Sequence, residues 1–84
     1  MSPAKRYLVR LYRYGHSLQA EQEHNLDPAD DRRLREVLEQ MVHVRRGTLR
    51  LDLSEWSIVV HAPGGGRRFA RVSVDGSGRT VVKR

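Results

Sequence analysis

Basic and aromatic side chains alternate near the start of the chain, in the segment KRYLVRLYRY at residues 5–14. In an extended strand, this alternation places Arg10, Tyr12 and Tyr14 on one face. Guanidinium groups neutralise phosphates and aromatic rings stack on unpaired bases, so the combination is typical of sheets that bind RNA or single-stranded DNA. Tyrosine and arginine are also enriched at protein interfaces, so a protein partner is equally compatible with the pattern.

A glycine-rich segment at residues 63–66 is followed directly by Arg67 and Arg68. A flexible loop with two adjacent cations can wrap the backbone of a nucleic acid. The segment differs from the phosphate-binding loop of nucleotide-hydrolysing proteins, because it lacks the Gly-Lys-Ser/Thr ending and no helix is predicted after it. We therefore expect a hairpin connection that adds two cations to a binding surface.

The residue types and their spacing give little indication of a catalytic activity. The histidines at 16, 24, 43 and 61 are scattered, and no pair has the i, i+4 spacing of a helical metal site. The chain has no cysteine, which excludes thiolate ligands, cysteine nucleophiles and disulfides. No serine lies in the context of a nucleophile elbow. We expect a non-enzymatic protein with no metal, no cofactor and no small-molecule substrate.

The net charge of +6 is concentrated at the two ends of the chain. Residues 1–14 carry four basic side chains and no acid, and residues 63–84 carry six basic side chains against Asp75 alone. The middle of the chain holds the other nine acids against six arginines. If the first and last strands are neighbours, the two ends form a single basic patch. The arginine-rich composition is also typical of a GC-rich genome.

The length of 84 residues predicts one small domain with one core. A core of this size stabilises a fold only modestly, so a partner or a second copy would add stability. No apolar run approaches the roughly 18–20 residues that span a bilayer, and the first residues do not resemble a secretion signal. We expect a cytoplasmic protein that does not associate with membranes.

The clearest element is an amphipathic helix over about residues 28–46. Asp27 is expected at the N-cap and Pro28 at the first helical position. Gly47 is of the type that ends a helix in the left-handed conformation. The apolar residues recur at helical spacing and form a single stripe, comprising Leu34, Val37, Leu38, Met41 and Val42.

Alternating apolar residues predict strands over 5–14, 48–53, 56–62 and 67–75, and an edge strand over 79–83 is left open. Residues 16–26 favour either a short helix over 18–24, capped by Ser17, or an acidic loop. The predicted fold is α+β with the order β-α-β-β-β, or with one more strand at the end. The helix packs on one face of an antiparallel sheet.

The face of the sheet opposite the helix combines arginines with aromatic and aliphatic side chains, which is unusual for a solvated surface, so a partner should cover it. Together with Arg67 and Arg68, this face forms the candidate binding site. Two hypotheses stay open, a nucleic-acid-binding face and a protein-interaction face of a homodimer, an inhibitor or an assembly factor. The residues expected on the face are Arg10, Tyr12, Tyr14, Arg50, Val59, His61, Phe69 and Arg71.

Overall fold

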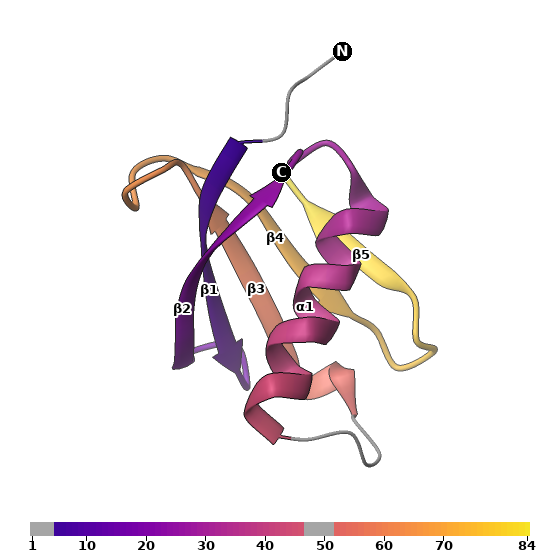
Figure 1. Ribbon diagram of the computed structural model, residues 1–84. Coiled ribbons are helices and arrows are strands. Elements are labelled where there is room, and N and C mark those ends of the chain that lie inside the picture. Colours follow the sequence, from indigo (N-terminus) through magenta and orange to yellow (C-terminus); the bar gives the residue numbers. More distant parts are fainter. Residues whose placement is uncertain (1–4, 47–51) are drawn as a thin grey trace.

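One helix packs on one face of a five-stranded antiparallel sheet (Figure 1) in the computed structural model of the protein, which describes residues 5–46 and 52–84. The predicted α+β class, with its helix on a single face, is confirmed. The order across the sheet is β2-β1-β3-β4-β5. In chain order the elements are β1 (Lys5–Arg13), β2 (Ser17–Leu26), α1 (Asp31–Arg46), the 3-10 turn η1 (Leu53–Glu55), β3 (Trp56–His61), β4 (Arg68–Val74) and β5 (Thr80–Lys83).

The core lies between α1 and the sheet, where apolar side chains from both layers are removed from water. The apolar stripe predicted for the helix is buried in full. Alternate residues of β1, β3 and β4 face it, as the alternating apolar residues of these segments indicated. These inward residues are Tyr7, Val9 and Leu11 of β1, Trp56, Ile58 and Val60 of β3, and Ala70, Val72 and Val74 of β4.

Residues 17–26 form a strand, which corrects the expectation of a short helix or a loop. The strand β2 forms a hairpin with β1 in which Lys5 pairs with Leu26 and Arg13 with Ser17. Positive φ angles at Tyr14 (56°) and Gly15 (80°) turn the chain sharply between the two strands, as tight hairpins require. The Gln, Ala and Glu residues of β2 favour a helix locally, but pairing with β1 overrides that preference.

The helix starts three residues later than predicted, and its N-cap is Asp30 in place of Asp27. The Oδ1 atom of Asp30 accepts a hydrogen bond from the Arg33 backbone N–H at 3.2 Å, and its carbonyl accepts one from Leu34 at 3.1 Å. Asp27 instead closes the preceding turn, because its Oδ1 atom accepts a hydrogen bond from the Ala29 N–H at 2.9 Å. Both aspartates have capping chemistry, and the sequence alone does not say which one is used.

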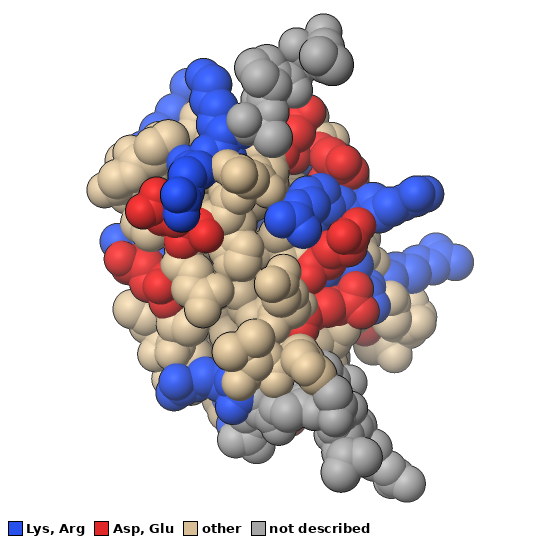
Figure 2. Space-filling view, viewed as in Figure 1, with Lys and Arg blue, Asp and Glu red and all other residues tan. Residues whose placement is uncertain are grey.

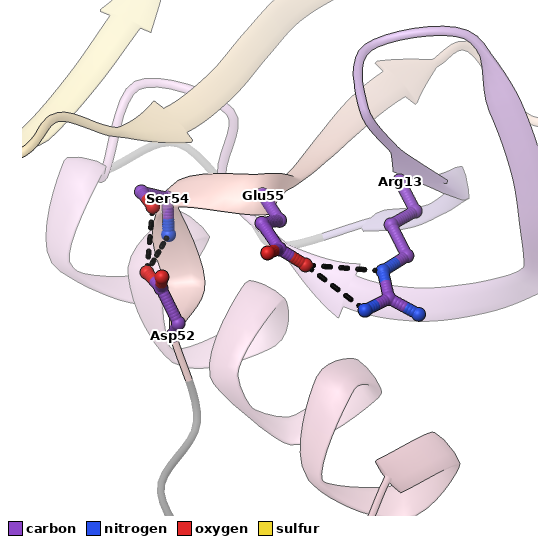
Figure 3. Close-up of polar contacts among 4 residues, drawn as sticks. All are labelled: Arg13, Asp52, Ser54 and Glu55. Carbon is purple, nitrogen blue, oxygen red and sulfur yellow. Dashed lines mark hydrogen bonds and ion pairs between the residues drawn. The ribbon is translucent and has the colours of Figure 1, made fainter.

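The strand predicted over 48–53 falls largely outside the described residues, as do Gly47, Leu49, Arg50 and Leu51. Its last residue, Leu53, belongs to η1 and is half-buried against the core. Asp52 caps this turn by accepting hydrogen bonds from the Ser54 backbone N–H at 3.0 Å and from the Ser54 hydroxyl at 2.6 Å (Figure 3). The chain therefore enters β3 through a capped helical turn.

The sequence did not decide whether residues 79–83 form an edge strand, and the strand is present as β5, which pairs with β4. The first and last strands are not neighbours, since β3 and β4 lie between β1 and β5. The condition for a single basic patch from both chain ends is therefore not met. Among the described residues, no helix is long and apolar enough to cross a membrane.

Candidate functional site

The face of the sheet that α1 leaves uncovered is called here the open face, and it carries two rows of side chains that cross all five strands. It comprises the residues of these two rows together with Leu8 and His61, which lie opposite one another on β1 and β3. In the order β2, β1, β3, β4 and β5, the first row is Glu21, Arg10, Val59, Arg71 and Lys83. In the same order, the second row is Leu18, Tyr12, Ser57, Ser73 and Val81.

The half of the open face formed by β2 and β1 is electrically neutralised by ion pairs. The Nε atom of Arg10 donates a hydrogen bond to Oε2 of Glu21 at 2.8 Å, and Arg6 lies 3.8 Å from Glu23. The hydrogen bond that Arg10 donates to Glu21 is the main reason that the pKa of Arg10 is raised. Alternating glutamates in β2 match the alternating arginines of β1, a signal that becomes readable only once the two strands are known to pair.

The half formed by β4 and β5 carries positive charge without acidic partners. Arg71 and Lys83 are directly opposite one another on neighbouring strands, and Arg68 is opposite His61. None of these three cations forms an ion pair within the described part of the chain. Like charges directly opposite one another destabilise a sheet. An anion bound between them would remove this repulsion.

Charges on the other side of the molecule are arranged differently. In Figure 2, which views the side that carries α1, acidic and basic side chains lie next to one another. The helix holds the pairs Arg33–Glu36 and Arg35–Glu39, and Arg84 pairs with Asp31 at its start. The helix surface therefore presents mixed charges, in contrast to the unpaired cations of β4 and β5.

Two turns border the open face at opposite ends of the strands. The loop after β3 approaches Leu8 so closely that a Cβ atom on Gly65 would lie 3.1 Å from its Cδ2 atom. The turn between β1 and β2 approaches Arg71, whose Nη2 atom donates to the Gly15 carbonyl at 3.4 Å. Glycine is needed at both places, because each also has a positive φ angle.

A small cavity lies beside the second of these turns and is called here the Ser57 cavity. Its volume is about 270 Å³. It is lined by Tyr14 and Gly15 of the turn, by Ser54, Glu55, Trp56 and Ser57 around the start of β3, and by Arg71 and Ser73 of β4.

The acidic residue of this cavity is already neutralised. Glu55 accepts hydrogen bonds from Nη2 of Arg13 at 2.9 Å and from Nε at 3.2 Å, and Figure 3 shows the two side chains directed at one another. The Arg13 guanidinium also lies 5.0 Å from the centre of the Tyr14 ring and 5.1 Å from that of Trp56. A backbone hydrogen bond of 2.7 Å from Tyr14 to the Glu55 carbonyl fixes the turn against η1.

A second cavity, of about 330 Å³, is lined by Arg35, whose Nε atom is buried without a hydrogen-bond partner in the described residues and lies 3.5 Å from Oε1 of Glu39. Arg35 donates to the Gly78 carbonyl and to the Thr80 hydroxyl at 3.0 and 2.9 Å. Hydrogen bonds from the serine hydroxyls two residues further on lower the pKa values of Asp52 and Asp75. These contacts hold the local turns together, and the carboxylates of Asp52 and Asp75 line the cavity, so it does not suit an anion and is not the candidate site.

The structure brings together most, though not all, of the site residues predicted from the sequence. Arg10, Tyr12, His61 and Arg71 lie on the open face, and Tyr14 lies on the turn at its border with its side chain 60% exposed. Arg68 is the first residue of β4 and lies opposite His61, whereas Arg67 precedes the strand and its guanidinium lies 5.6 Å from the centre of the Phe69 ring. Arg50 lies outside the described residues. Sequence reasoning missed Gly15, Ser57, Ser73 and Lys83, since only the strand register shows that they surround Arg71.

Phe69 is not on the open face, which corrects the prediction. Val60 pairs with Ala70 and His61 pairs with Arg68, so Phe69 is an additional residue in β4. Such a bulge interrupts the alternation of side chains between the two faces. The Phe69 ring packs edge-on against the inward-facing Tyr7, with ring centres 5.4 Å apart. It therefore supports the core and is not available as a stacking platform.

Within the described part of the chain, no three or more histidine, aspartate or glutamate side chains are grouped so that they could hold a metal ion. Comparisons with known protein families, with characterised proteins and with solved structures find no match to this chain.

Proposed function

We propose that the protein is a small non-enzymatic domain that binds single-stranded nucleic acid, RNA or DNA, on the open face. The observation that carries the proposal is the pair of cations Arg71 and Lys83, directly opposite one another and without an acidic partner in the described residues. A phosphate backbone running along β4 and β5 would neutralise both side chains. This contact would remove the repulsion between the two like charges, and its relief would contribute to the free energy of binding.

The shape of the surface favours a single strand over a duplex. The exposed Tyr14 lines the same cavity as Arg71, and Tyr12 lies opposite Ser57 on the neighbouring strand, so both rings are available to stack on unpaired bases. The outward surface of α1 carries acidic as well as basic side chains, so it is a poor candidate for insertion into a duplex groove. Arg68, opposite His61 at the other end of β4, extends the basic track for the backbone.

The test compares two charge-matched variants in their affinity for a labelled single-stranded oligonucleotide of about ten nucleotides. We expect Arg71→Gln/Lys83→Gln to weaken binding about tenfold or more at low salt. It should also reduce the slope of log K against log salt by about 1.4, from two phosphate contacts at about 0.7 each. The control Arg32→Gln/Arg45→Gln removes the same charge from α1 and should bind almost as the wild type does.

Failure of the wild type to bind RNA and single-stranded DNA at low salt would refute the proposal. Equal weakening by both variants would show that net charge, and not the open face, controls the affinity. The anisotropy of a fluorescent oligonucleotide measures the affinity of the wild type and of both variants under the same conditions.

A homodimer is the second candidate, and the distribution of charge on the open face favours it. The first row begins at β2 with Glu21, which is paired with Arg10, and ends at β5 with Lys83, so two copies facing each other about a two-fold axis parallel to the strands would place unlike charges opposite one another. Val59, on the central strand, would lie in the middle of such an interface, with Leu8 and Val81 nearer its edges. Light scattering should then show a dimer that Tyr12→Asp dissociates, whereas a strict monomer excludes this candidate.

A further inference from the structure

The Ser57 cavity contains a buried hydroxyl group with no hydrogen-bond partner. Ser57 is 4% exposed, and its Oγ atom has no partner among the described residues, although the residue lines the cavity. Buried hydroxyl groups are normally hydrogen-bonded, because leaving one unpaired lowers stability. Alanine at this position would avoid the penalty, so the hydroxyl group needs an explanation outside the folding of the chain.

Arg71 places a positive charge at the same cavity and leaves most of its donors free. Its Nη2 atom makes a long hydrogen bond of 3.4 Å to the Gly15 carbonyl, and it has no acidic partner in the described part of the chain. A guanidinium group has five N–H donors arranged to meet two oxygens of a carboxylate or phosphate at once. Lys83, directly opposite on β5, makes the surroundings more positive.

The other groups of the cavity are compatible with an anion. Ser73 lies directly opposite Ser57 on the neighbouring strand, which brings a second hydroxyl to the same place. The charge of Glu55 is compensated by Arg13 through two hydrogen bonds, so it does not oppose an incoming anion. The volume of about 270 Å³ lies below the roughly 300–1,000 Å³ of sites for drug-sized ligands, so it suits a small group.

We propose that the Ser57 cavity binds one phosphate group. Arg71 supplies the charge and a two-oxygen contact, and the hydroxyls of Ser57 and Ser73 donate to the remaining oxygens. Ser57 reaches the anion by rotation between staggered positions of its side chain. As a refinement that rests on the proposed function, the group is a phosphodiester of the bound strand, held at the end of the track marked by Arg71 and Lys83.

The first experiment titrates the protein with inorganic phosphate while chloride keeps the ionic strength constant. The ³¹P line width of phosphate detects binding directly. Emission of Trp56, which is the single tryptophan of the chain and lines the cavity, locates it. We expect Ser57→Ala to weaken phosphate binding about fivefold, as loss of one hydrogen bond does. Arg71→Gln should weaken it more, whereas Ser77→Ala and Arg79→Gln, in the turn after β4, should leave it unchanged.

Chemical denaturation distinguishes a ligand-binding hydroxyl from a structural one. Ser57→Ala should be as stable as the wild type or more stable, because it removes a buried polar group without a partner. The cavity proposal is overturned if phosphate changes the signals of the wild type no more than chloride does. It is also overturned if the Ser57→Ala variant binds phosphate as tightly as the wild type.

The same variants separate this inference from the proposed function. If the protein binds the oligonucleotide, and Ser57→Ala changes neither its affinity for the oligonucleotide nor its affinity for phosphate, the proposed function is supported and the cavity proposal fails. If phosphate binds in the cavity but no oligonucleotide binds, the proposed function fails and the cavity serves a free phosphate or a phosphorylated small molecule.

Discussion

At the scale of single residues, the open face combines side chains that stabilise the fold with side chains that do not. Arg10 and Glu21 form a hydrogen-bonded ion pair, and Val59 is nearly buried between its neighbours. Arg71 and Ser57, in contrast, carry a charge and a hydroxyl that nothing in the described residues satisfies. Residues that lower stability are common at binding sites, so the site is argued from these two.

His24 gives a pH-dependent prediction on the opposite side of the sheet. It faces Tyr7 across β2 and β1 and is half-buried. Burial, and secondarily the charge of Arg33, lowers its pKa from the ordinary 6.5. The unfolded chain therefore binds a proton more readily, and this residue should reduce stability progressively as the pH falls below about 6.5.

Replacing His24 with glutamine should consequently flatten the dependence of unfolding free energy on pH between about 7 and 5. Urea denaturation at several pH values measures the effect on both proteins. A variant that loses stability as steeply as the wild type over this interval would show that another group is responsible.

At the scale of elements, local sequence patterns correctly predicted the helix and the strands whose residue types suit their position in the fold. The helix stripe and the alternating residues of β1, β3 and β4 are buried as predicted. The strand β2 was missed because its polar residues favour a helix locally, and only pairing with β1 makes it a strand. Phe69 was assigned to the wrong face because a single bulged residue in β4 inverts the alternation.

The start of α1 provides a test of which aspartate caps the helix. Asp30→Ala should lower the unfolding free energy by about 1 kcal/mol, because it removes the side chain that accepts the Arg33 N–H. Asp27→Ala should cost less, since Asp27 closes only the turn before the helix. Thermal or urea denaturation ranks the two variants, and the reverse order would place the N-cap at Asp27.

At the scale of the whole molecule, the distribution of charge depends on which strands are adjacent. The sequence showed two basic chain ends, but the arginines of β1 meet the glutamates of β2, and β1 is separated from β5. Free positive charge is left on β4 and β5. Alternation along the chain correctly placed Arg71 and Tyr12 on the open face, whereas the contribution of Lys83, Ser57 and Gly15 depends on long-range register.

The most direct measurement is the change in amide chemical shifts when a single-stranded oligonucleotide is added to ¹⁵N-labelled protein. The proposed function predicts that the largest changes fall on residues of β3, β4 and β5 around Ser57, Arg71 and Lys83, with small changes along α1. Changes concentrated on α1, or an unchanged spectrum at low salt, would contradict the assignment of the open face as a nucleic-acid-binding surface.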